Sequence, residues 1–229
     1  MTRLDKDLAE SLSHAKELTE EFKLNLPKKI EAASLSLKSK LPFKAVSLRE
    51  VLIHRLTELS EVACDLYERK KIVSAFIITR SVMETAAMLY WLYSKVKKAV
   101  DSQDIGDIND FLNRALLGWR DTKMPAQAYN ILTAVDEIDK IFNGYRSLYD
   151  SLSEFAHPNW SGVHGAYAKI NTKEYSVDLG SEVTELPVAI GLPPLEGSLE
   201  VFKHYYNELS TLFPSFIQVC DDEINKASS

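Results

Sequence analysis

Two charged residues interrupt an apolar run in the first half of the chain. Arg80 and Glu84 lie within residues 72–96, IVSAFIITRSVMETAAMLYWLYSKV. A spacing of four residues places their side chains on one face of a helix. The guanidinium could then bind a phosphate or a carboxylate, with Glu84 orienting it. Alternatively, the two residues form a buried ion pair that joins neighbouring helices, since buried charges are usually paired.

A second group of polar residues lies in the segment YRSLYDSLSEFAHPNWSG, residues 145–162. Arg146, Asp150, Ser153 and His157 project within a narrow arc if a helix continues through His157. Arg146 and His157 are then about 16 Å apart along the helix axis, so they do not bind one small group together. Ser153 and His157 can meet directly because they are four residues apart.

His157 precedes Pro158, at the expected C-terminus of this helix, where the helix dipole favours a protonated imidazole. As a functional group it would act as a general acid or base, or bind a phosphate, at the mouth of a cleft facing Arg80. As a structural group it would cap the helix and pack against Trp160, with its imidazole bonded to Ser153 or to a carbonyl. A mechanism requires a second group, so the position of His157 relative to Arg80 decides between these interpretations.

Two motifs of the chain resemble those of uncharacterised bacterial proteins grouped with the HEPN nucleotide-binding and ribonuclease superfamily. Both motifs lie within residues 50–160. They are a helix with the pattern R-S-x-x-E (Arg80, Ser81, Glu84) and a later helix that ends L-S-x-x-x-H-P (Leu152, Ser153, His157, Pro158). The resemblance implies an α-helical fold and a homodimer.

Catalytic members of that superfamily carry an arginine and then a polar residue shortly before the histidine, and dimerisation brings two such motifs together for metal-independent RNA cleavage. The resemblance therefore implies that His157 is this histidine and Ser153 the polar residue. Leu152 stands where the arginine is expected, and Arg146 lies too far upstream. A catalytic site would need Arg80, from the adjacent helix, in place of that arginine.

The composition is that of a globular protein, and its charge is unevenly distributed. The 229 residues are 45% hydrophobic and 26% charged, with a formal net charge of −6. Residues 1–98 hold 18 Lys and Arg against 13 Asp and Glu, and the remainder holds 9 against 20, so the two parts carry +5 and −11. Proteins that bind duplex nucleic acid normally present a concentrated basic surface. The sequence predicts no such surface, although a local basic cleft is compatible with it.

Several features predict a cytoplasmic protein that does not enter a membrane. Cys64 and Cys220 lie far apart within apolar helical patterns, which is typical of buried thiols rather than of a disulfide. The first residues are charged and lack the apolar region of a signal peptide. Arg80 and Glu84 disfavour a membrane span over residues 72–96, because each charge costs about 2.5–3.5 kcal/mol in the hydrocarbon of a bilayer.

No metal or cofactor site is expected. The sequence contains no glycine-rich phosphate loop, and no acidic or cysteine ligand set has recognisable spacing. The five histidines are scattered, at His14, His54, His157, His164 and His204. Aromatic residues are expected in the core or in an interface rather than as stacking platforms for bases, namely Tyr90, Trp91, Tyr93, Tyr205 and Tyr206.

Helical periodicity predicts an all-α protein, a multi-helix bundle of five to seven helices with antiparallel neighbours and a small β-hairpin near residues 166–180. A single domain over residues 1–229 is expected. Its segments are an N-terminal helical segment (1–45), a HEPN-like helical core (46–158), a hairpin and loop insertion (159–197) and a C-terminal helix (198–229). Ser47 with Glu50 is expected to cap the second long helix, and Ser198 to cap the last.

The resemblance implies a HEPN-like protein that binds nucleotide, RNA or a protein partner in a defence or stress context. If it is a ribonuclease, Arg80 and His157 are the catalytic candidates, supported by Glu84, Ser153 and Arg146. The alternative is a non-catalytic structural or protein-interaction module. A ribonuclease requires Arg80 and His157 to converge on an open cleft, preferably repeated across a two-fold interface. An interaction module predicts an exposed apolar patch instead.

Overall fold

The computed structural model describes residues 3–119, 126–182, 184 and 186–227. Within them the chain forms nine α-helices, one short 3-10 helix and one pair of strands. The long helices are α1 (Arg3–Leu24), α3 (Leu41–Glu68), α4 (Ile72–Ser102), α5 (Ile108–Leu117), α6 (Ile131–Asp139), α7 (Tyr145–Ala156) and α9 (Leu192–Ala227). The short elements are α2 (Ala32–Leu35), α8 (His164–Tyr167), β1 (Ala168–Asn171), β2 (Ser176–Leu179) and η1 (Val188–Ile190). The prediction of an all-α multi-helix bundle with a small β-hairpin is confirmed.

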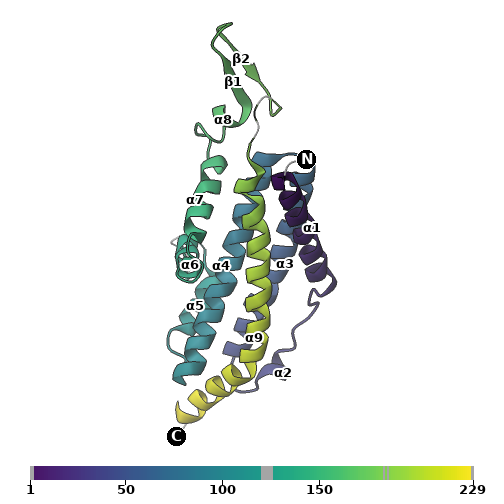
Figure 1. The fold of residues 1–229 in the computed structure, drawn as a ribbon. Coiled ribbons are helices and arrows are strands. Elements are labelled where there is room, and N and C mark those ends of the chain that lie inside the picture. Colours follow the sequence, from purple (N-terminus) through teal and green to yellow (C-terminus); the bar gives the residue numbers. More distant parts are fainter. Residues whose placement is uncertain (1–2, 120–125, 183, 185, 228–229) are drawn as a thin grey trace.

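α4 is the central element of the bundle. It is apolar around most of its circumference, and Phe76, Met83 and Leu92 are fully buried. It packs against α3, α6, α7 and α9, and lies behind α9 and between α7 and α3 in Figure 1. The helix is long and apolar enough to cross a membrane, and half of its most apolar window is buried against the rest of the protein.

The expectation of antiparallel neighbours holds for α3 but not for α9. A short connection, residues 69–71, joins α3 to α4, so these two helices run in opposite directions. The start of α9 adjoins the start of α4, because a Cβ atom at Gly191 would collide with the Phe76 ring. Further along both helices, the rings of Tyr90 and Tyr205 are in contact, with centroids 4.9 Å apart. α4 and α9 are therefore parallel.

The second long helix begins earlier than its expected cap. α3 starts at Leu41, with Pro42 in its first turn, so Ser47 lies inside the helix. Proline is well accommodated there, because the first N–H groups of a helix have no intrahelical acceptor. Glu50 is buried and forms an ion pair with Arg49 instead of closing a capping box.

The last helix also begins before its expected cap, so the insertion ends at Gly191 rather than at residue 197. α9 starts at Leu192 and carries two prolines, at positions 193 and 194, in its first turn. Ser198 lies inside α9 and is buried. Its Oγ is 3.2 Å from the hydroxyl of Tyr145, the first residue of α7, so it joins two helices rather than starting one.

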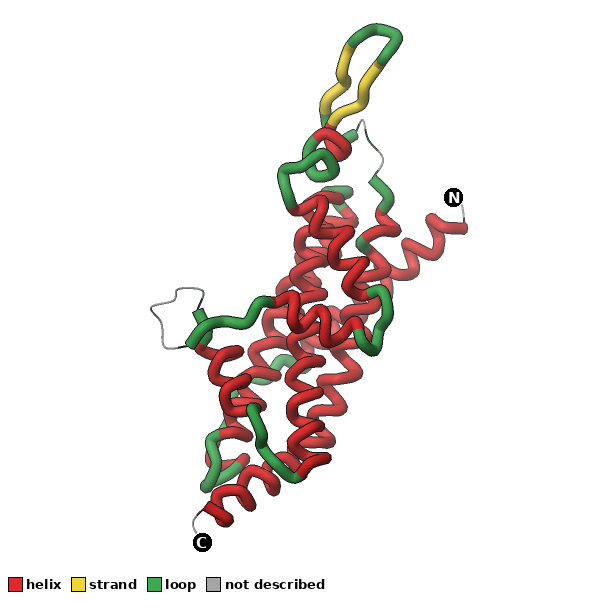
Figure 2. Tube along the Cα trace, turned by 90° about the vertical axis from the view of Figure 1, so that its left-hand side faces the viewer, coloured by secondary structure: helices red, strands yellow, loops and turns green. Residues whose placement is uncertain are grey.

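The β-hairpin projects from one end of the bundle. β1 and β2 pair antiparallel from Ala168 opposite Leu179 to Asn171 opposite Ser176, close to the predicted position. The strands pack mainly on each other and on α8. Figures 1 and 2 show the ribbon extending away from the helices.

His14 connects α1 to α9. Its Nδ1 lies 2.8 Å from Oε1 of Glu196, and its Nε2 lies 3.1 Å from Oε1 of Glu200. The hydrogen bond to Glu196 raises the pKa of His14 above its ordinary value of 6.5, burial opposes this shift, and the charge of Glu200 reinforces it. These contacts between α1 and α9 therefore favour a protonated His14.

We expect His14→Gln to lower the urea midpoint of unfolding more at about pH 5.5 than at about pH 8.5. Because the folded-state pKa of His14 is raised, its ion pairs contribute fully below the unfolded value of 6.5 and are lost as the pH rises through the folded value. Circular dichroism at both pH values measures the difference from wild type. The difference should shrink in a Glu196→Gln background, and an effect that is equal at both pH values would contradict the prediction.

Candidate functional site

Arg80 and Glu84 form an ion pair that joins α4 to α7. The Arg80 Nη2 lies 3.3 Å from the Glu84 Oε1, and the two side chains are 28% and 20% exposed. The hydroxyl of Tyr149 on α7 donates to the same Glu84 oxygen at 2.8 Å. The guanidinium carbon of Arg80 lies 5.0 Å from the centre of the Tyr149 ring, within the range of a cation–π contact. These three side chains satisfy one another between the two helices.

The chemistry of this cluster is that of a structural connection. Burial raises the pKa of Tyr149, the Glu84 carboxylate raises it further, and Arg80 opposes the shift. The phenol therefore stays protonated and donates to the carboxylate. One polar atom is left over, because the Arg80 Nε is buried and has no hydrogen-bond partner among the described residues.

His157 directly follows α7 and is exposed. Its backbone is extended (φ −94°, ψ 147°), because Pro158 disfavours the helical conformation in the residue before it. The predicted contact with Ser153 is wrong, since the Ser153 Oγ donates to the Tyr149 carbonyl at 2.9 Å. Trp160 stacks with His164 rather than with His157, with ring centroids 6.4 Å apart.

Arg80 and His157 do not converge within one chain. Arg80 is level with Tyr149 on α7, and Tyr149 precedes His157 by eight residues. At the rise of a helix, this separation is about 12 Å along the axis. No hydrogen bond or ring contact joins Arg80 to His157 among the described residues.

Arg146 forms ion pairs with acidic side chains of α6 and α7. Its Nη1 lies 2.5 Å from Asp136 of α6, and its Nε lies 3.0 Å from Asp150 of α7. Its backbone N–H donates to Asp139 at 2.9 Å. These carboxylates neutralise the guanidinium and fix the start of α7 against α6, so Arg146 does not join Arg80 or His157.

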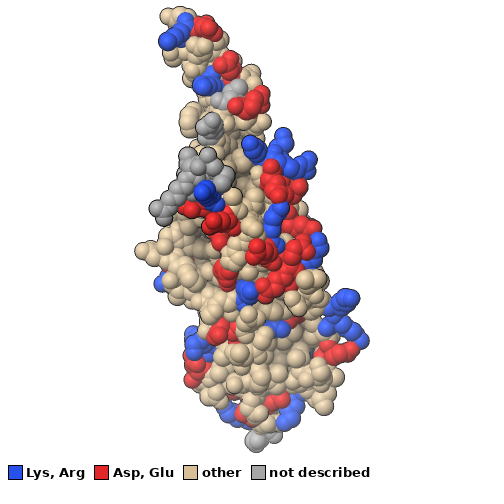
Figure 3. Space-filling model, turned by 45° about the vertical axis from the view of Figure 1, so that its right-hand side comes forward, with Lys and Arg blue, Asp and Glu red and all other residues tan. Residues whose placement is uncertain are grey.

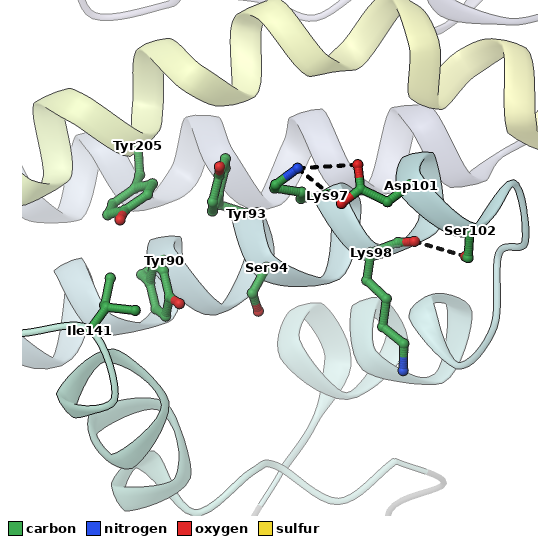
Figure 4. A pocket seen from close by; sticks show the side chains of 9 residues that line it. All are labelled: Tyr90, Tyr93, Ser94, Lys97, Lys98, Asp101, Ser102, Ile141 and Tyr205. Carbon is green, nitrogen blue, oxygen red and sulfur yellow. Dashed lines mark hydrogen bonds and ion pairs between the residues drawn. The ribbon is translucent and has the colours of Figure 1, made fainter.

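A groove elsewhere on α4 brings together side chains that the sequence did not single out as a site. It has a volume of about 640 Å³ and opens between α4, α9 and the residue Ile141. Tyr90, Tyr93 and Tyr205 form one end of it, with ring centroids 4.7–6.2 Å apart. Figure 4 shows the three rings gathered where α9 crosses this part of α4. We call this pocket the tyrosine groove.

The other end of the tyrosine groove is polar. Lys97 forms an ion pair with Asp101 at 2.9 Å. Lys98 is exposed, and its ammonium group has no ion-pair partner among the described residues. Ser94 and Lys98 point to the same side of α4 in Figure 4, the side on which Tyr90 lies. The groove therefore has partly buried aromatic rings at one end and an exposed lysine at the other.

The tyrosines of the groove carry available hydroxyl groups. Burial raises the pKa of Tyr90 and of Tyr205, so both phenols are neutral near pH 7. No hydrogen bond joins the hydroxyls of Tyr90, Tyr93 and Tyr205 to the described residues. These aromatics were expected in the core or in an interface, and the structure places Tyr90, Tyr93 and Tyr205 partly buried against the core. The spacing of Tyr90, Ser94 and Lys98 by four residues places them on one stripe of α4.

Neither a metal site among the described residues nor a similar protein indicates a function. Among the side chains that the structure describes, no group of three or more His, Cys, Asp or Glu residues could hold a metal ion. Comparisons of the chain with protein-family models, curated proteins and solved structures give no significant match. The placement of side chains is therefore the basis for a functional proposal.

We expect Tyr149→Phe to reduce the free energy of unfolding by about 1.5–3 kcal/mol, the usual loss for a hydrogen bond to a charged group. In this variant Glu84 would keep its ion pair with Arg80 but would lose the hydrogen bond that the Tyr149 hydroxyl donates to the same carboxylate oxygen. Tyr93→Phe is the matched control, since its hydroxyl has no bond to the described residues. Urea unfolding of both variants measures the difference, and equal losses would show that the Tyr149 hydroxyl is not a specific connection.

Proposed function

We propose that the protein is a binding protein for nucleotides, free or within single-stranded RNA, and that the tyrosine groove is its binding site. The main support for this proposal is that one open groove contains Tyr90, Tyr93 and Tyr205 together with Lys98, whose ammonium group has no ion-pair partner among the described residues. This function needs no convergence of Arg80 and His157. It agrees with the structural role of the Arg80, Glu84 and Tyr149 cluster.

The two ends of the groove match the two ends of a nucleotide. A base stacks on tyrosine rings through its flat face, which contributes about 1–3 kcal/mol per base. Tyr90 and Lys98 are eight residues apart on α4, which is about 12 Å along the helix. A sugar and a phosphate bridge a gap of this order, so Lys98 would pair with the phosphate as a point charge.

The surface charge favours a single nucleotide or a short single strand over a duplex. Figure 3 shows Lys and Arg side chains intermingled with Asp and Glu on the face that it presents. Duplex binding depends on many phosphate contacts to a continuous basic surface. A groove with one available lysine fits a ligand with one or a few phosphates.

We expect adenosine monophosphate and a short single-stranded RNA to bind the wild-type protein, and Tyr205→Ala to weaken Kd by about 5- to 150-fold through lost stacking. Lys98→Ala should weaken the binding of phosphate-containing ligands but leave the affinity for adenosine unchanged. Isothermal titration calorimetry measures both effects. Tyr175→Ala is the matched control, because Tyr175 lies on the distant hairpin turn and is 97% exposed. Binding that survives Tyr205→Ala and Lys98→Ala unchanged would exclude the groove.

A second candidate function is metal-independent RNA cleavage by a site composed of two copies of the chain. Its supporting observation is that the His157 imidazole is exposed and has no hydrogen-bond partner among the described residues. An imidazole in this state is available for general acid or base catalysis. The site would take His157 from one copy and Arg80 from the other, because one chain keeps them apart.

If this second function holds, RNA is cleaved in the presence of EDTA and His157→Ala lowers the rate by about 10²–10⁴-fold. Arg80→Ala should also lower it, with circular dichroism confirming that each variant is folded. Glu84→Gln controls for damage to the connection between α4 and α7. Wild-type protein that cleaves no RNA would exclude this candidate and leave nucleotide binding unaffected.

A further inference from the structure

α1 packs on the outside of the bundle, mainly against α3 and α9. Figure 1 shows it lying along these two helices. The helices that cover α4 are α3, α6, α7 and α9, so the central helix does not depend on α1 for its burial. Residues 25–31, which follow α1, contain no helix or strand. The geometry therefore allows α1 to move as a unit while the rest of the bundle keeps its packing.

The apolar contact of α1 is small for a helix of 22 residues. Among the side chains of α1 that the structure describes, the buried apolar ones are Ala15, Leu18 and Phe22, whereas α4 buries eleven. Leu8 and Leu12 are partly buried against the core. Hydrophobic stabilisation scales with the apolar area removed from water. Burial therefore attaches α1 to the bundle less firmly than it holds α4.

Charge pairs join α1 to α3. Lys16 forms an ion pair with Glu68, and the Nζ of Lys23 lies 2.8 Å from Oε1 of Glu61. The four side chains are 42–54% exposed. Exposed ion pairs are individually weak, and salt screens them. These two pairs therefore hold α1 against α3 mainly at low ionic strength.

A second set of charge pairs joins α1 to α9. The Nζ of Lys203 donates to Oε2 of Glu21 at 2.6 Å. His14, when protonated, pairs with Glu196 and Glu200 through its two ring nitrogens. These side chains are also open to solvent in part. Since the pairs on both sides of α1 are accessible to ions, salt weakens the attachment of the whole helix.

The thiol of Cys64 lies beneath α1. Cys64 belongs to α3 and is buried. Together with Lys16 and Thr19 of α1, it lines a depression of about 320 Å³ between α1 and α3. Burial raises the pKa of Cys64 to about 11, and the contact with Thr19 opposes the shift. While α1 is in place, the thiol is therefore protonated and covered.

We propose that α1 is a detachable helix, which leaves α3 and α9 as a unit when its charge pairs are screened and thereby uncovers Cys64. The rest of the bundle stays folded in this step. Cys220 stays covered, because it is buried in the last part of α9, beside Ser39. The proposal does not depend on nucleotide binding, since the tyrosine groove is lined by α4, α9 and Ile141 rather than by α1.

The test is the rate at which iodoacetamide, an uncharged reagent, alkylates each cysteine of the wild-type chain at constant pH, followed by mass spectrometry of its peptides. Between about 0.05 M and about 1 M KCl we expect the rate at Cys64 to rise about fivefold or more, because screening releases α1 and local opening limits access to the thiol. The rate at Cys220 should remain unchanged. Equal increases at both cysteines would indicate global unfolding, and either that result or a constant rate at Cys64 overturns the proposal.

A charge swap tests the same step at low salt. Lys16→Glu should speed the alkylation of Cys64, because α1 then repels α3 at Glu68, and adding Glu68→Lys should restore the slow rate. The matched control is Lys6→Glu, which changes the charge of α1 equally, since Lys6 forms no ion pair with the described residues. A carboxylate at position 16 disfavours the thiolate, so faster alkylation of the single variant indicates exposure. A double variant that reacts as fast as Lys16→Glu would show that this pair does not hold α1 in place.

Discussion

The whole bundle depends on one constraint, which is that α4 must be covered on nearly every side. A helix with apolar residues around its circumference is stable in water only when other elements bury it. α3, α6, α7 and α9 do so, and Phe76, Met83 and Leu92 lie at the centre of the packing. α9 runs parallel to α4, so the chain between them must return from the end of α4 to its start. α7 belongs to this returning part of the chain, and it therefore packs against α4 at Arg80.

The charges within α4 follow from the same constraint. A guanidinium and a carboxylate on such a helix cannot reach open solvent fully, so each needs a partner. Glu84 has two partners, the guanidinium of Arg80 and the hydroxyl of Tyr149. Arg80 also contacts the ring of Tyr149. The arginine and the glutamate of the R-S-x-x-E pattern therefore connect α4 to α7, and the buried Arg80 Nε has no hydrogen-bond partner among the described residues.

The sequence predicted the elements well where the pattern is local. The apolar periodicity of α4, the end of α7 before Pro158 and the hairpin around the turn after Asn171 all depend on neighbouring residues. α3 and α9 start before their predicted caps, Ser47 and Ser198, because the first turn of a helix accepts proline. Tertiary contacts decide such starts, and one of them buries Ser198 against Tyr145.

The candidate site was less predictable because side chains have competing partners that spacing does not reveal. Ser153 and His157 have the right separation to meet, but the Ser153 hydroxyl bonds to the carbonyl one turn earlier, a common alternative for serine in helices. The convergence of Tyr90 and Tyr93 with Tyr205 also depends on the parallel packing of α4 and α9, which no local pattern encodes.

His157 lies beyond Arg80 along α7. α7 packs against α4 in the antiparallel direction, with Tyr145 at Met83 and Tyr149 at Arg80, and His157 follows the last residue of α7. The segment that follows His157 leads directly into the hairpin, the element with an uncovered apolar face. The exposed imidazole therefore lies at the end of the bundle from which the hairpin projects, whereas the tyrosine groove lies between α4 and α9.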